Sequence, residues 1–191
     1  VNLQSGQNIP LQQSAIRLNL QYPTKSGFKG EPDTCLFLLN AQGKVSGDSD
    51  FIFYNNLSSP EGAVKLVTGS QQSSIEITLD RVPANISKIA ITVVIDGEDT
   101  ISGLSSLSMQ AQGIAEFQAE TQGRSEKQLS WVKYIGTMAP GSFVRSGRVS
   151  TVVLSLWPLA MALMSHSQLR SQQSLLVSVW KRNWKPDLRA L

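Results

Sequence analysis

The chain has 191 residues, of which 41% are hydrophobic, so it is long enough for one globular domain with or without an extension. Its single cysteine, Cys35, excludes an intrachain disulfide, and we expect neither a secretory signal nor a bilayer-spanning run of about 20 apolar residues. The net charge of +3 combines two unequal parts: residues 1–127 carry −4 and residues 128–191 carry +7, which predicts a boundary between them.

The first half of the chain contains short strand-like segments separated by turn residues. Apolar and polar side chains alternate at residues 16–20 and 75–79, which predicts half-buried strands. Apolar runs at residues 36–39 and 51–54 predict two further strands, and the Gly-, Pro- and Lys-containing residues 22–33 predict a loop.

The pattern continues up to residue 127. Residues 88–95 are almost all apolar and β-branched, which predicts a central strand buried on both faces. Residues 104–109 predict a short helix, and residues 114–121 alternate as another half-buried strand. Short strands at this spacing predict an all-β fold, an antiparallel β-sandwich with one or two short helices.

Oxygen-bearing side chains surround the run at residues 51–54. Asp48 and Asp50 precede it, and Asn55 and Asn56 follow it. Such oxygens suit a hard cation such as Ca²⁺, which usually takes six to eight oxygen ligands. The alternative is that the two aspartates cap turns and the two asparagines stabilise a left-handed or Asx turn. The sequence alone leaves both interpretations open.

The same region resembles a known family. The stretch GDSDFIFYNNL, next to an LFLLN run and followed by a Val82-Pro83 turn, is similar to the TerD superfamily of tellurite-resistance proteins. The opening VNLQSGQNIPL is closest to the TerA-type members, and the resemblance covers about residues 1–127. It implies a bacterial β-sandwich stress protein, in a superfamily of which several members bind calcium.

The resemblance also implies where calcium ligands would lie. Family members with calcium sites carry an acidic DFDLD-type stretch before the LFLL strand. Here Asp33 and Glu31 match its last and middle acids, whereas Lys29 replaces the first. The acidic loop of the family is represented by residues 67–73, which contain no carboxylate. We therefore expect at most one weak calcium site, from Glu31, Asp33, Asp48, Asp50, Asn55 and Asn56.

Catalytic chemistry is not expected. His166 is the only histidine and lies beyond residue 127, so no Ser-His or Cys-His pair can form within residues 1–127. Cys35 falls in a predicted strand, where it reads as a small buried hydrophobe, and the sequence shows neither a phosphate-binding Gly-rich loop nor a zinc-type spacing. Asp96, Glu98 and Asp99 form a small acidic cluster that fits a solvated loop, a carboxylate pair or a second cation position.

Residues 128–191 follow neither the strand period nor the helix period for long, and they contain all four tryptophans. Permissible codons for QLSWVKYIGTMAPGSFVRSGRVS, read after dropping two bases, encode VILGEIYRHNGAWKFRAVGAGF, which resembles the usual ending of the family. We therefore hypothesise that the chain from about residue 128 is a frame-shifted reading, as one base lost from an A-run at Glu126-Lys127 would produce. The alternative is a genuine basic, Trp-containing extension.

The frame-shift hypothesis changes two other expectations. If it is correct, the +7 charge is accidental and no nucleic-acid or membrane binding is expected from it, although an isoelectric point of about 9.1 would suggest such binding. The sandwich would also lack its usual last strands, which would leave an unpaired strand edge.

Together with the resemblance, these patterns predict a non-enzymatic bacterial stress-response protein of the tellurite-resistance type. It would act as a binding or scaffold module with other tellurite-resistance proteins, in the cytoplasm or peripherally at the inner membrane through those partners. The alternative is a calcium-binding module that uses the acidic and Asn-containing loops, and no other cofactor is expected.

Overall fold

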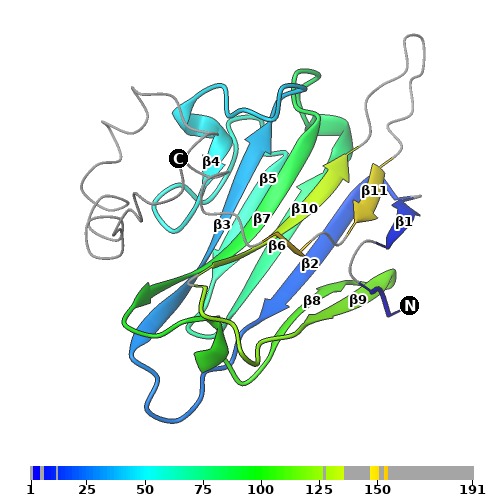
Figure 1. The fold of residues 1–191 in the computed structure, drawn as a ribbon. Helices are drawn as coiled ribbons and strands as arrows, with labels where there is room; N and C mark the ends of the chain where they lie inside the picture. The colour runs from blue at the N-terminus through cyan, green and yellow to red at the C-terminus, as the bar shows by residue number, and fades with distance from the viewer. Residues whose placement is uncertain are drawn as a thin grey trace, which may run out of the picture.

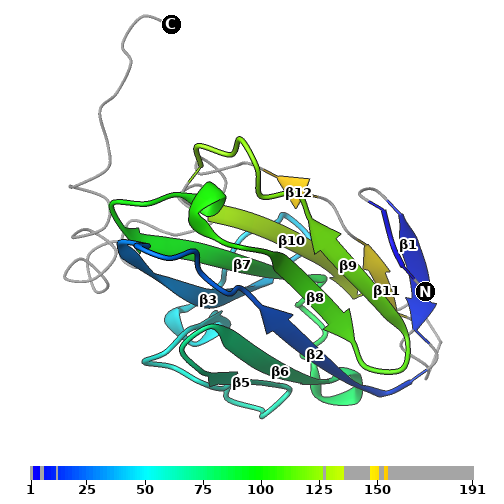
Figure 2. The same cartoon turned by 90° about the horizontal axis from the view of Figure 1, so that it is seen from below.

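The computed structural model describes residues 2–4, 7–11, 13–126, 128–135, 147–150 and 153–154, which form two antiparallel sheets packed as layers (Figure 1, Figure 2). The larger sheet has the order β1-β11-β10-β7-β3-β4, with β12 also pairing with β10. Its strands are β1 (Asn8–Leu11), β3 (Gly30–Leu39), β4 (Phe51–Ile52), β7 (Lys88–Gly97), β10 (Gln128–Ile135), β11 (Gly147–Ser150) and β12 (Val153–Leu154).

The smaller sheet has the order β5-β6-β2-β8-β9. Its strands are β2 (Ala15–Gln21), β5 (Val64–Thr68), β6 (Gln72–Thr78), β8 (Leu107–Ala111) and β9 (Ala115–Ala119). Short 3-10 turns are found at η1 (Asp48–Asp50), η2 (Leu79–Arg81) and η3 (Ile101–Gly103). The predicted β-sandwich with short helical segments is confirmed.

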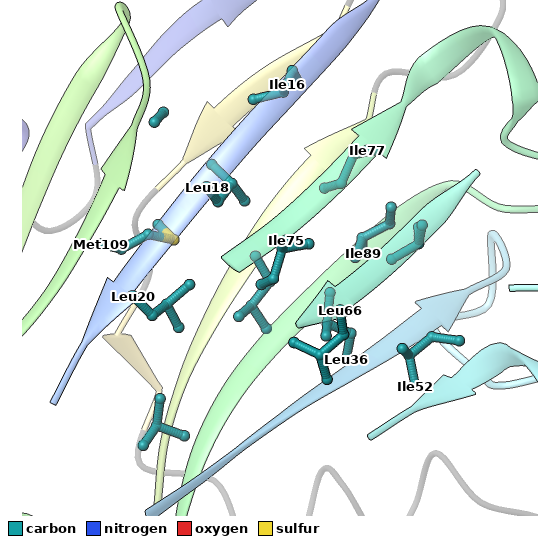
Figure 3. Packing of buried hydrophobic residues seen from close by; sticks show 14 of the residues in the cluster. Ile16, Leu18, Leu20, Leu36, Ile52, Leu66, Ile75, Ile77, Ile89 and Met109 are labelled. Atoms are coloured by element: carbon teal, nitrogen blue, oxygen red, sulfur yellow. The ribbon is translucent and has the colours of Figure 1, made fainter. Parts of the chain in front are cut away.

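The core lies between the two sheets. On β2, Ile16, Leu18 and Leu20 are at most 4% exposed, because alternate residues of a strand point to the same face. Figure 3 shows Leu18 and Leu20 beside Ile75 of their own sheet, and Leu36 of the larger sheet beside Leu66 of the smaller sheet, all in one cluster. Burying each aliphatic side chain contributes about 1.5–3 kcal/mol, so this layer supplies most of the stability of the fold.

Strand β7 lies at the centre of the larger sheet and is apolar on both faces, as predicted. It pairs with β3 on one side and with β10 on the other. Ile89 points into the core between the sheets, whereas Ala90 packs on the opposite face with a second, aromatic cluster. In that cluster Phe51 stacks between Phe37 and Phe53, with ring centroids 4.8 Å and 4.7 Å apart.

Some elements differ from the prediction. The short helix expected at residues 104–109 is wrong, because Leu107–Ala111 forms strand β8. Leu107 and Met109 are buried and the residues between and after them are more exposed, which is the period of a strand and not of a helix. The predicted loop at residues 22–33 ends early, since β3 begins at Gly30. Strand β5 is an addition to the predicted strands.

Strand β10 lies just beyond the predicted boundary at residue 127. It pairs with β7 from Gln128, opposite Val94, to Tyr134, opposite Lys88. The edge of the sheet that the frame-shift hypothesis would leave unpaired is therefore occupied in the structure, and β11 and β12 pair with β10 in turn. The change in charge along the chain thus coincides with the first residue of a strand of the larger sheet.

Strand β3 has an open edge over part of its length. Strand β4 covers that edge at only two residues of β3, and no described strand lies beside residues 30–35 on that side. The hydrogen bond from Glu98 N to Lys29 O, of 2.9 Å, indicates that the odd-numbered residues of β3 bond to β7. The even-numbered residues therefore direct their backbone groups to the open edge, and one of them is Pro32, which has no N–H.

Candidate functional site

Three carboxylates, those of Glu31, Asp33 and Asp96, lie on the outer face of the larger sheet, at one end of β3 and β7. Glu31 lies directly opposite Asp96 in the strand register, and Asp33 follows two residues later on the same face of β3. Burial, and then repulsion from Glu31 and Asp96, raises the pKa of Asp33 from 3.8 to about 6. Like charges on opposed strands destabilise a sheet, so a cation or a proton at this position would relieve the repulsion.

Cys35 and Tyr54 lie beside these carboxylates. Burial, and then the neighbouring Asp33, raises the pKa of the Cys35 thiol to about 12. Tyr54 is 42% exposed, and burial followed by the charge of Asp33 raises the pKa of its phenol. Reactive thiols and phenols have lowered pKa values, so neither group is activated as a nucleophile at neutral pH.

Lys29, Glu98 and Asp99 form a separate group at the corner of the sheet. Lys29 Nζ lies 3.5 Å from Glu98 Oε2, and the backbone N–H of Lys29 donates to Asp99 Oδ2 at 2.6 Å. The backbone N–H groups of Glu98 and Asp99 donate in turn to Lys29 O. Of the predicted acidic cluster at residues 96–99, Asp96 therefore joins Glu31, whereas Glu98 and Asp99 bind the backbone and side chain of Lys29.

Asp50 stabilises the turn that leads into β4. Its Oδ2 accepts a hydrogen bond from the backbone N–H of Ser46 at 3.2 Å. Burial raises the pKa of Asp50, backbone hydrogen bonds from Ser46 and Gly47 act in the opposite direction, and repulsion from Glu61 adds to the rise. Asp48 is exposed at the start of the same turn. This arrangement matches the turn-stabilising interpretation of Asp50.

The turn at Asn55 and Asn56 follows β4. Asn56 Nδ2 donates to Phe51 O at 2.6 Å, and Phe53 and Asn56 exchange two backbone hydrogen bonds of 3.0 Å and 2.9 Å. Asn55 is exposed at the tip of the turn. The side chain of Asn56 therefore holds the backbone of the turn. Neither asparagine has a positive φ, so the expected left-handed conformation is wrong.

The six predicted calcium ligands fall into two groups. Glu31 and Asp33 lie with Asp96 at the start of β3, whereas the aspartates and asparagines around β4 lie beside residues further along β3. Within the described part of the chain, no three His, Cys, Asp or Glu side chains are close enough together to hold a metal ion. The sequence did not predict that Asp96 lies opposite Glu31, because only the strand register brings these two residues together. His166 lies outside the described residues.

Comparison with known proteins places this sandwich in a family. The TerD domain matches residues 1–125. The chain belongs to the TerD family. Two proteins named tellurium resistance protein TerD, from Serratia marcescens and an Alcaligenes species, are each 38% identical to it over 110 residues, which cover 50% of this chain and 57% of theirs. General stress protein 16U of Bacillus subtilis (strain 168) is 32% identical over the same shares of the two chains.

The chain therefore spans little more than half the length of these curated relatives. Two solved structures share its fold: a homologue of telluride resistance protein (TerD) from Streptomyces coelicolor A3(2), with a TM-score of 0.56 and 14% identity, and a protein of unknown function, with a TM-score of 0.58 and 15% identity. Each match covers 78% of this chain and 95% of the other. In the residues that the structure describes, no helix is long and apolar enough to cross a membrane.

Proposed function

We propose that this chain is a non-enzymatic binding or scaffold module in a bacterial stress response that includes tellurite resistance. The observation that carries the proposal is the match of residues 1–125 to the TerD domain, whose relatives are named tellurium resistance and general stress proteins. The module would act with other tellurite-resistance proteins, in the cytoplasm or peripherally at the inner membrane through them. The raised pKa values of Cys35 and Tyr54 support a role other than nucleophilic catalysis.

The turns that flank β4 are the proposed surface for a partner. Asp48 and Asn55 are exposed on these turns, and Tyr54 is 42% exposed. Phe51 and Phe53 are buried and stacked, so they hold the turns in place. An exposed tyrosine beside polar groups on a rigid support is typical of the residues that dominate binding between proteins.

Survival on tellurite tests this proposal. The full chain and its variants would be expressed in a bacterial strain that depends on the plasmid-borne copy for growth on tellurite. We expect Tyr54→Ala and Asp48→Lys to reduce survival markedly, because loss of one interface anchor weakens binding by about 2 kcal/mol, or more than tenfold. Their melting temperatures should stay close to that of the unaltered chain.

Glu116→Lys is the matched control for the charge change. Glu116 is exposed on β9, in the smaller sheet, so this variant should leave survival unchanged. Equal survival of all three variants would contradict the location of the surface. No benefit from the unaltered chain would contradict the function itself.

The alternative function is the binding of calcium or another divalent ion by Glu31, Asp33 and Asp96, which share one face of β3 and β7. Binding would require their side chains to move closer together than they lie in the structure. Asp33 is partly buried beside two like charges, and among the described residues the charged groups that raise its pKa are Glu31 and Asp96. A bound cation would offset this repulsion and lower the pKa of Asp33, so binding near pH 6 would release protons.

Thermal unfolding in calcium tests the alternative. A ligand that binds only the folded state stabilises it by about 2.7 kcal/mol at a hundredfold excess over its dissociation constant. We expect millimolar calcium to raise the melting temperature at pH 7.5, Asp33→Asn to abolish this rise, and Asp80→Asn, at an exposed acid in η2, to retain it. If Asp50→Asn abolishes the rise instead, the ion binds at the turns around β4. No rise at all would contradict calcium binding.

A further inference from the structure

We draw no further inference here: the strongest candidate, the cluster of Glu31, Asp33 and Asp96 beside the half-exposed ring of Tyr54 on the outer face of β3 and β7, belongs to the cation site already described as an alternative, and nothing in the described part of the structure shows what else would cover it.

Discussion

Three buried hydroxyl groups join the two sheets. Thr34 on β3 and Ser73 on β6 are 1% and 4% exposed, and their Oγ atoms lie 2.7 Å apart. Thr34 Oγ1 also lies 3.5 Å from the hydroxyl of Tyr22, and burial raises the pKa of that phenol. A buried hydroxyl without a partner costs about 1–3 kcal/mol, so these contacts matter for stability. They also help to fix how one sheet lies on the other.

Asp33 makes the stability of the fold depend on pH. Its pKa rises from 3.8 to about 6 on folding, so between these values the folded state binds a proton that the unfolded state releases. Stability should therefore fall as the pH rises from about 4 through about 6, by roughly 2 kcal/mol after allowance for solvent screening. Asp33→Asn removes the buried charge. Its melting temperature should exceed that of the unaltered chain at pH 7.5 but not at pH 4.

Thermal unfolding followed by circular dichroism, in buffers with EDTA, would check this pH dependence. Glu116→Gln is the matched control, because Glu116 is an exposed acid on the smaller sheet. Its effect on the melting temperature should be small at both pH values. If Asp33→Asn changed the melting temperature equally at pH 4 and pH 7.5, the raised pKa of Asp33 would be wrong.

At the scale of elements, the antiparallel pair of β3 and β7 ends in two facing glycines, Gly30 and Gly97. Gly97 has a φ of +138°, and a Cβ atom there would lie 2.5 Å from Gly30 Cα and 2.6 Å from Lys29 O. Both the backbone conformation and the missing space therefore require glycine. We expect Gly97→Ala to lower the free energy of unfolding by about 2–4 kcal/mol.

Gly113→Ala separates the cost of the backbone conformation from the cost of the steric clash. Gly113 also has a positive φ, of +71°, but no atom lies within 4 Å of the position of a Cβ. This variant should lose only about 1 kcal/mol, the cost of the left-handed conformation. Urea unfolding would measure both losses. If both variants lost the same free energy of unfolding, the close approach of β3 and β7 would not contribute to the requirement for glycine at position 97.

Alternation in the sequence predicted the strands that have one solvated face. Strands β2, β6 and β9 follow the expected pattern, and the apolar run of β7 correctly indicated burial on both faces. The first residues of β3 were predicted as a loop because Glu31 and Asp33 place charged groups on the outer face of the strand. Strand β8 was taken for a helix because a five-residue apolar pattern fits either period.

The candidate site was predictable only where its contacts are local. The hydrogen bonds of Asp50 and Asn56 span four or five residues, and a turn-stabilising role was one of the two interpretations of the sequence. The pairing of Glu31 with Asp96 joins distant strands, and register depends on the whole sheet. No local pattern could have identified that contact.

At the scale of the whole molecule, the main prediction is that residues 128–191 are read in a shifted frame. Residues 128–134 pair with β7 through backbone groups, which almost any residue can supply, so this pairing fits either frame. We expect the natural gene to have one more base in the A-run at Glu126-Lys127, and the natural protein to differ in mass from the 191-residue chain. Sequencing of the gene and an intact mass would check this.

The opposite result would also be informative. A gene and a mass that match the present chain would contradict the frame shift and make the basic, Trp-containing extension genuine. Deletion of residues 136–191 would then be the next experiment, with nucleic-acid binding and vesicle binding as its readouts. Unchanged binding after the deletion would remove the extension from consideration.

Pro32 has a consequence for how copies of the protein behave when they are crowded. An open strand edge is a template on which an identical strand of another molecule can add, and fibrils grow by repeating that step. On the uncovered part of β3, Pro32 removes a donor from the edge, and the charged Glu31 and Asp33 on either side would repel their counterparts in a second copy. The same strand that carries Glu31 and Asp33 is thereby a poor seed for amyloid, so copies of the protein can stay dispersed at high concentration.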